Sequence, residues 1–195
     1  MILDPLFEQI QDSHEQYPFF CTAPSVFNPN ECQKIIDMHK HASVIKHEKS
    51  ADDKTKIRFT EVYWLFPDDN TRWVYEKLTR LVKKVNTDVF KYELDGVPFK
   101  IQLTRYVTGG IHNWHCDVGP KETSRRKISL SVQLTDPVQY EGGKLSLMTN
   151  NGVKEGSSDQ GDASIFGSWV MHKVDELSSG ERWSLVAWVT GNPFK

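Results

Sequence analysis

In the second half of the chain, apolar and polar residues alternate one by one, which is the pattern of a β-strand with one buried face. In RKISLSVQLT (126–135), apolar side chains at every second position alternate with serine, glutamine and threonine. A period of two places all the apolar side chains on one face of a strand, whereas a helix repeats about every 3.6 residues. The chain must therefore fold around a sheet with one buried face.

Other segments have the same strand character and are separated by turn-forming residues. Gly142-Gly143, the polar loop NNGVKEGSSDQG (150–161) and Ser179-Gly180 are expected to be turns or loops. The strands predicted between and before them cover residues 56–66, 99–107, 126–135, 143–148, 162–167, 171–174 and 181–190.

Two helices are predicted before most of these strands. At the start of NPNECQKIIDMHKH (28–41), Asn28 can cap the helix, Pro29 suits the first helical position and Glu31 can complete a capping box. A second helix is predicted over TRWVYEKLTRLVKKVNTDVF (71–90), where apolar residues recur every three or four positions. The stripe consists of Val74, Leu78, Leu81, Val82, Val85 and Val89.

Early helices followed by about eight short strands favour an α+β fold, in which N-terminal helices buttress a β-sandwich or a jelly roll (double-stranded β-helix). A length of 195 residues suits a single domain, 1–195. Within it we expect helical support over about 1–95 and the jelly-roll core over about 96–191. Two charged segments, 39–56 and 119–127, are either solvated connections or lids over a site.

Charge and composition exclude several function classes. Lys plus Arg number 24 and Asp plus Glu 26, so the formal net charge is −2 and no general positive field attracts nucleic acid or anionic membranes. Apolar runs are too short to span a bilayer, and acidic residues stand where a signal peptide needs basic ones. Three cysteines, an odd number, make no disulfide framework. We therefore expect a protein of the reducing cytoplasm.

A histidine and an aspartate one residue apart are the first candidates for chemistry. His115 and Asp117 lie in IHNWHCDVG, and alternate residues of a strand point the same way, so both could ligate one ion. The simpler interpretation is a surface strand with two polar residues in water. Cys116 is expected to point to the other face and pack there, and His112 to point away from the metal.

His172 and Arg182 come later in the chain, each in an apolar setting. A lone histidine in SIFGSWVMHKV is more often a hydrogen-bonded core residue than a ligand. Arg182 shares a strand face with Ser184, Val186 and Trp188. A guanidinium keeps its charge and needs an anion there, either an internal Asp or Glu or the carboxylate of a ligand.

His115, Asp117, His172 and Arg182 indicate a function more specifically together than any of them does alone. Two histidines and one carboxylate on one face of a metal form the facial triad of non-haem Fe(II) oxygenases. Zinc accepts the same ligand types. Arg182 argues against a zinc hydrolase, because it is placed to bind the far carboxylate of a bidentate keto acid.

Over about residues 56–191 the chain resembles the Fe(II)/2-oxoglutarate dioxygenases of the prolyl 4-hydroxylase type, in particular their bacterial and viral members. Agreement of several motifs in order and spacing is far more specific than any single motif. The motifs are LTRY (103–106), HCD (115–117), RKISLSVQLTDP (126–137) leading to YEGGKLSL (140–147), GDASIFGSWVMHKV (161–174) and GERW (180–183).

The resemblance implies a role for each matching position. His115, Asp117 and His172 correspond to iron ligands, and Arg182 to the partner of the distal 2-oxoglutarate carboxylate. Tyr106 resembles a tyrosine that contacts the co-substrate or substrate, although it could merely pack its strand.

Four further positions are candidates for the pocket wall. Trp188 and Val174 match wall positions of the family but could equally be core. Ser131 or Gln133 could hydrogen-bond the co-substrate, and the spacing does not choose between them.

The family also implies the reaction. We expect Fe(II), 2-oxoglutarate and O2, with ascorbate open as a further ligand, and hydroxylation of an amino-acid residue with release of succinate and CO2. A prolyl residue in a peptide or protein is favoured, and a free amino acid or small metabolite is the alternative. Nucleic-acid demethylation is disfavoured, because Trp188 stands where such relatives carry a second arginine. Asp175-Glu176 replaces a Thr-Pro of many relatives, which puts substrate contacts in doubt.

A catalytically dead binding module on a jelly roll is the remaining alternative. The four intact candidate ligands, the metal triad and Arg182, argue against such decay.

Overall fold

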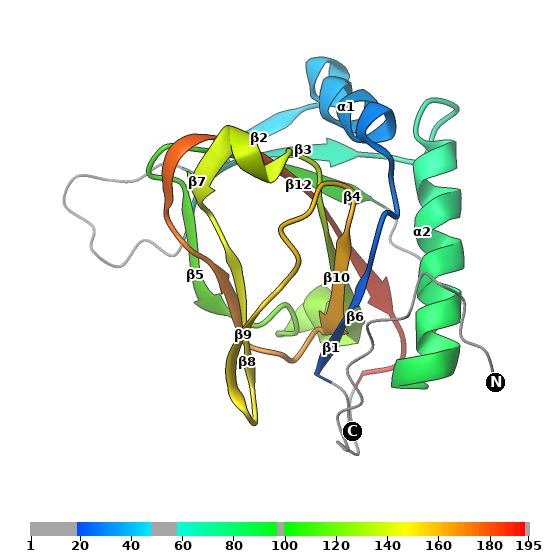
Figure 1. Cartoon of the computed structure of the whole chain (residues 1–195). Coiled ribbons are helices and arrows are strands. Elements are labelled where there is room, and N and C mark those ends of the chain that lie inside the picture. Colours follow the sequence, from blue (N-terminus) through cyan, green and yellow to red (C-terminus); the bar gives the residue numbers. More distant parts are fainter. Residues whose placement is uncertain (1–18, 48–57, 97–99, 194–195) are drawn as a thin grey trace.

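The computed structural model describes residues 19–47, 58–96 and 100–193, which form one curled antiparallel sheet flanked by helices (Figure 1). The strands are β1 (Phe20–Ala23), β2 (Val44–His47), β3 (Arg58–Leu65), β4 (Ile101–Val107), β5 (Ile111–His115), β6 (Arg126–Gln133), β7 (Tyr140–Gly142), β8 (Leu145–Thr149), β9 (Gly152–Glu155), β10 (Ala163–Gly167), β11 (His172–Val174) and β12 (Leu177–Thr190).

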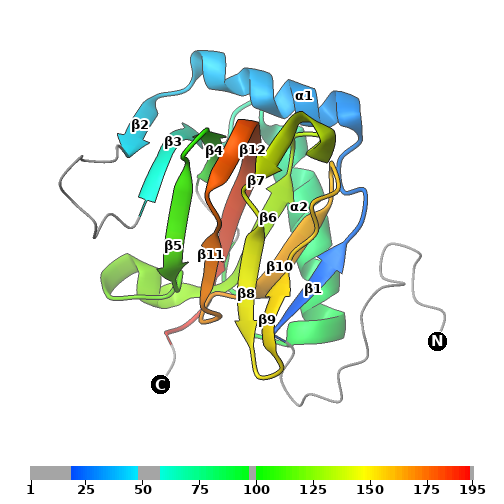
Figure 2. The same cartoon turned by 60° about the vertical axis from the view of Figure 1, so that its left-hand side comes forward.

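The sheet curls into two layers, and this confirms the predicted double-stranded β-helix. Its strand order is β1-β10-β6-β12-β4-β3-β5-β11-β8-β9, with β2 beside β3 and β7 beside β12. We call β1-β10-β6-β12-β4-β3 the major layer and β5-β11-β8-β9 the minor layer. Figure 2 shows the minor layer in front of the major one. The division into support and core stays a prediction; β1 and β3, from the first 95 residues, are part of the major layer.

Each predicted strand is present, but three local predictions were wrong. The charged segment 39–56 contains β2, which pairs with β3; residues 48–57 lie outside the described part. The polar loop 150–161 contains β9, paired with β8. The last strand begins at Leu177, and Ser179-Gly180 lies inside it, where Gly180 has φ +81° and the pairing with β7 is irregular.

Helix α1 (Pro29–Asp37) begins as predicted. Asn28 accepts a hydrogen bond from the Glu31 N–H, and the Glu31 carboxylate accepts one from the Asn28 N–H, which completes the capping box. Cys32 and Ile35 are buried, and the chain continues as a 3₁₀ turn, Met38–His41.

Helix α2 (Arg72–Val85) also matches its prediction, and a π turn, Asn86–Phe90, extends it. It packs on the outer side of the major layer (Figure 1), so that its apolar stripe and the strands form one core. The buried stripe is Val74, Leu78, Leu81, Val82 and Val85.

The second charged segment, 119–127, is also partly ordered structure. It forms a 3₁₀ turn, Lys121–Arg125, followed directly by β6. A further 3₁₀ turn, Pro137–Gln139, precedes β7. The three cysteines are free thiols, and neither described α-helix is long and apolar enough to cross a membrane.

Candidate metal centre and its cavity

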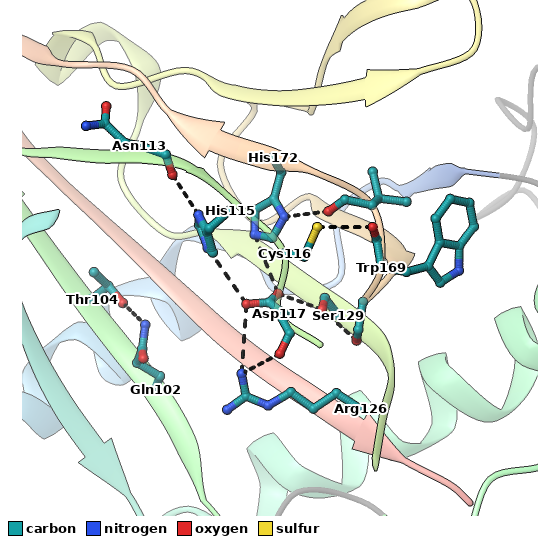
Figure 3. Close-up of polar contacts among 12 residues, drawn as sticks. Gln102, Thr104, Asn113, His115, Cys116, Asp117, Arg126, Ser129, Trp169 and His172 are labelled. Atoms are coloured by element: carbon teal, nitrogen blue, oxygen red, sulfur yellow. Dashed lines mark hydrogen bonds and ion pairs between the residues drawn. The ribbon is translucent and has the colours of Figure 1, made fainter. Parts of the chain in front are cut away.

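The structure brings His115, Asp117 and His172 together between the two layers. His115 ends β5, His172 begins β11, and the two residues are direct cross-strand partners. Their Nε2 atoms both face the Asp117 carboxylate, at 3.8 Å from Oδ1 for His115 and 3.5 Å from Oδ2 for His172 (Figure 3). One ligand atom from each residue lies within 4.8 Å of the others, which is close enough to share an ion.

Hydrogen bonds to the backbone determine which ring nitrogen of each histidine is available. His115 Nδ1 lies 2.7 Å from the Asn113 carbonyl oxygen and His172 Nδ1 lies 2.9 Å from that of Val170. A carbonyl oxygen can only accept, so both Nδ1 atoms carry the proton. Both Nε2 atoms are thereby left with a lone pair directed at Asp117, as metal-binding histidines require.

Asp117 is positioned from the opposite layer. It was expected on the same strand as His115, but β5 ends at His115. Instead, the Asp117 N–H donates to the Ser168 carbonyl (3.0 Å) and Ser129 Oγ donates to Asp117 Oδ2 (2.7 Å). Ser129 and Ser168 are also hydrogen-bonded to each other at 2.9 Å, and both are fully buried.

Arg126 lies beside this carboxylate and was not predicted as a site residue. Its Nη1 is 3.2 Å from the Asp117 carbonyl oxygen and 3.9 Å from Oδ1, and its guanidinium lies 3.8 Å over the Trp188 ring. Burial lowers the pKa of this guanidinium, and the Asp117 charge partly offsets that effect. The β6–β12 pairing is irregular here, with Arg126 opposite Thr190 but Ile128 opposite Val189, and the irregularity turns Arg126 toward the cavity.

His112 was predicted to point away from the metal, and this was wrong. Its ring stacks on His115, with centroids 3.7 Å apart and planes 21° apart, and it lines the cavity. Between the pairs His172–His115 and Val174–His112, β11 has one residue and β5 has two. This irregularity places His112 and His115 on the same face. His112 is outside the group of ligand atoms that could share an ion.

Cys116 lies at the edge of the cavity, where its thiol donates to the Trp169 carbonyl at 3.2 Å. Burial and the neighbouring Asp117 charge raise the pKa of this thiol. A protonated thiol tied to the backbone is a packing contact rather than a ligand.

Arg182 is buried, with 3% of its surface exposed, and pairs across the strands with Tyr106. Its guanidinium carbon lies 5.3 Å from the Tyr106 ring centroid, and its Nη1 has no hydrogen-bond partner in the part of the chain that the structure describes. No described Asp or Glu forms an ion pair with it. A buried, unpaired guanidinium is costly unless an anion binds to it.

A cavity of about 480 Å³ opens next to the three candidate ligands. Tyr106, Ser131, Val174 and Trp188 line it. Gln133 is buried outside the lining: its Nε2 donates to the Thr135 carbonyl, and its Oε1 has no partner among the described residues. The remaining lining side chains are mostly apolar, aromatic or hydroxyl-bearing: Ile45, Val62, Trp64, Gln102, Val118, Thr123, Leu145, Phe166, Ser184 and Val186.

Comparisons with known proteins agree with this geometry. Residues 101–190 match the family model of the 2OG-Fe(II) oxygenase superfamily. A PKHD-type hydroxylase of Parvibaculum lavamentivorans is 33% identical over 115 residues, which cover 57% of this chain and 52% of the relative. The chain thus spans about half the length of that curated relative.

Over residues 101–190 the chain is similar to the 2OG-Fe(II) oxygenase superfamily. The fold of the chain is that of the prolyl 4-hydroxylase-like enzymes. A Pseudomonas putida prolyl-4-hydroxylase superposes with a TM-score of 0.72 at 18% identity, covering 89% of this chain and 92% of that one. A Trichoplax adhaerens prolyl hydroxylase, solved with a hypoxia inducible factor peptide fragment, gives 0.70 at 16% identity, with 88% and 83% covered.

Similarity to the superfamily implies Fe(II) and 2-oxoglutarate, and the residues present fit both groups. Two imidazole nitrogens and a carboxylate are the donors that non-haem Fe(II) takes. The orphaned Nη1 of Arg182 is a buried cation that lacks an anion. Among the site residues, sequence reasoning missed Ser129, Ser168 and Arg126, which lie inside the family motifs but were given no role there.

Proposed function

We propose that this chain is a 2-oxoglutarate-dependent hydroxylase that acts on a prolyl residue of a peptide or protein. The observation that carries the proposal is the convergence of two Nε2 lone pairs and one carboxylate on a single point beside a cavity. Bound there, Fe(II) with 2-oxoglutarate and O2 would supply the oxidising power to insert one oxygen atom into a C–H bond, giving succinate and CO2.

The chain's own residues hold and orient the reactants. His115, His172 and Asp117 hold the metal, and Ser129 fixes the Asp117 carboxylate so that it presents Oδ1 and Oδ2 in one orientation. Arg182 binds the distal carboxylate of 2-oxoglutarate, and Tyr106, whose ring it contacts, walls the same space. Burial of this cation strengthens its attraction for the carboxylate, because little water competes.

The apolar wall of the cavity excludes water from the reacting centre. Phe166 of the major layer lies against His172, with ring centroids 4.7 Å apart, and Val174 and Leu145 line the cavity from the minor layer. A dry cavity protects the oxidising species from unproductive reaction and lets the substrate C–H bond approach. The volume of about 480 Å³ has room for a small diacid and one side chain.

Hydroxylation is favoured by the similarity to relatives named PKHD-type hydroxylases. A peptide substrate is favoured by the similarity to the prolyl hydroxylase solved with a peptide fragment. Ascorbate belongs to the proposal as the reductant that keeps the iron ferrous.

The deciding experiment measures succinate release with Fe(II), ascorbate and 2-oxoglutarate against three substrate sets: proline-containing peptides, free amino acids and methylated oligonucleotides. We expect turnover with peptides and a product heavier by one oxygen atom. His172→Ala, with the same mixture, is the control for metal-dependent turnover. Release that depends only on free amino acids or only on oligonucleotides would overturn the prolyl-peptide assignment.

A further inference from the structure

Two tryptophans on the major layer, each covered by a cation, form one wall of the cavity. The rings of Trp64 and Trp188 have centroids 6.4 Å apart. Lys100 Nζ lies 4.2 Å from the centroid of the Trp64 ring, and the Arg126 guanidinium lies 3.8 Å from that of Trp188. We call these four residues the cation–tryptophan wall.

Strand pairing places this wall directly beside the candidate metal centre. Trp188 of β12 pairs with Ser129 of β6, whose hydroxyl holds Asp117. Trp64 of β3 pairs with Gln102 of β4, which in turn pairs with Val186 of β12. Trp64, Gln102, Val186 and Trp188 all line the cavity, so the wall runs from the metal centre outward along one side.

One cation of this wall has no carboxylate partner among the described residues. Asp117 is the one carboxylate among the described residues that line the cavity. Arg126 forms a long ion pair with it, with Nη1 3.9 Å from Oδ1 and 3.2 Å from the Asp117 carbonyl oxygen. Lys100 is exposed and forms no ion pair with any acidic residue in the described ranges. The charge of Lys100 is therefore open to an anionic group that lies beside the Trp64 ring.

We propose that the cation–tryptophan wall binds the substrate chain next to the hydroxylated residue and selects an acidic side chain there. Lys100 and Arg126 supply the charge, while the two indole rings hold both cations in place and offer apolar surface to the peptide. This inference rests on the proposed function and deepens it, because it names the class of peptide: a target residue flanked by Asp or Glu.

An extended chain fits this wall better than a single amino acid does. A ligand that contacts both cations has to cross two tryptophan rings, which is beyond the reach of one amino acid held at the metal.

Nucleic acid, which is also anionic, fits this wall less well than an acidic peptide does. A base would stack on the tryptophan faces, but Lys100 and Arg126 already occupy a face of each ring. A carboxylate can instead approach the cations without displacing them.

The test compares proline peptides that differ only beside the proline, carrying Asp, Asn or Lys on its N-terminal or C-terminal side. Binding of dye-labelled peptides to the metal-free protein is followed by fluorescence anisotropy, and turnover by succinate release. For at least one side, we expect the Asp peptide to bind and react about tenfold better than the Lys peptide, with an advantage that shrinks as salt is added.

Lys100→Glu is the informative variant, because Lys100 is exposed, lies over a tryptophan ring that lines the cavity and forms no ion pair with Asp117. It should abolish or invert the preference for Asp over Lys. Lys154→Glu, an equally exposed lysine on β9, makes the same charge change elsewhere and should leave the preference intact. Arg126 is unsuited to this test, since it contacts Asp117.

The possible results distinguish failure of this inference from failure of the proposed prolyl-peptide hydroxylation. If Asn, Asp and Lys peptides react equally well, or if Lys100→Glu and Lys154→Glu behave alike, the role of the wall is overturned while peptidyl hydroxylation stands. If no peptide is hydroxylated, the proposed function fails and the inference fails with it. Tighter binding of single-stranded oligonucleotides than of any acidic peptide would also overturn it.

Discussion

Ser129 donates a 2.7 Å hydrogen bond to Oδ2 of Asp117. The Ser129 hydroxyl is also hydrogen-bonded to that of Ser168, in the connection between β10 and β11. The carboxylate is only 8% exposed, so water cannot replace this donor easily. The orientation of Asp117, the one anionic residue of the candidate metal ligands, therefore depends on the hydroxyl of Ser129, which is not itself a candidate ligand.

Replacing Ser129 should loosen the metal without unfolding the protein. Ser129→Ala removes the donor to Asp117, and such supporting contacts typically change metal affinity by about 10- to 100-fold. Anaerobic Fe(II) titration, or Mn(II) titration in air, measures the change. Ser124→Ala serves as the control, because this half-buried serine donates to the Lys121 backbone carbonyl and makes no hydrogen bond to Asp117. An unchanged dissociation constant for Ser129→Ala would show that Asp117 is held by other contacts.

Arg182→Gln should separate co-substrate binding from metal binding. The variant removes the buried cation, so the KM for 2-oxoglutarate should rise by about 100-fold or more, while Mn(II) affinity stays near that of the wild type. In a thermal-shift assay 2-oxoglutarate should stabilise the Mn(II)-loaded wild type and not the variant. Equal stabilisation of both proteins would place the carboxylate site elsewhere in the cavity.

We expect the flat ring of His112, rather than its nitrogen atoms, to support metal binding by His115. His112→Ala opens space beside a metal ligand and should weaken metal binding by about tenfold. His112→Phe keeps a flat ring in the same place and should stay within about threefold of the wild type. Metal titration of both variants tests this. If Phe is as damaging as Ala, a nitrogen of His112 is needed and the stacking explanation is wrong.

Stability in acid should depend on Glu31, which caps α1 and binds Lys77 of α2 through both carboxylate oxygens, at 2.7 and 2.8 Å. Burial alone would raise the pKa of Glu31, but the hydrogen bonds from Lys77 and the Asn28 N–H outweigh it and lower the pKa below 4.5. A lowered pKa adds stability above the unfolded-state value, and this stability is lost as the pH falls through the folded-state value.

Glu31→Gln should therefore be less stable than the wild type near neutral pH, and the gap should close as the pH falls from about 6 to about 3. Urea unfolding at a series of pH values measures it. Glu141→Gln, an exposed change on β7, should show no such trend. A gap of constant size at all pH values would mean that the charge of Glu31 does not contribute.

Local patterns in the sequence predicted much of this fold correctly. The capping box at Asn28, the apolar stripe of α2 and the alternation in β6 each depend on neighbours within a few residues, and all were confirmed. The sequence predicts loops where β2 and β9 lie. Each is a four-residue strand without clear alternation, and its described side chains, including apolar Val44, Ile45 and Val153, are exposed. Pairing with β3 and β8, rather than any pattern of their own, makes them strands.

The parts of the site that could not be predicted follow from irregular pairing. Strand alternation turns His112 and Arg126 away from the cavity, whereas the irregularities between β5 and β11 and between β6 and β12 turn both toward it. An extra residue in one strand reverses the alternation beyond it, and no local pattern marks where such a residue falls. Ser129 and Ser168 were likewise invisible, because their role depends on where Asp117 lies.

The direct cross-strand pairing of His115 with His172 also links folding to chemistry. Sliding β11 by one residue along β5 would swing His172 to the opposite side of the minor layer, and the chelating set would be lost. A misaligned molecule would thus be unable to capture iron, even if compact. Metal binding therefore stabilises only the molecules in which the two strands are correctly aligned. The ion selects the native register of the strands that bind it.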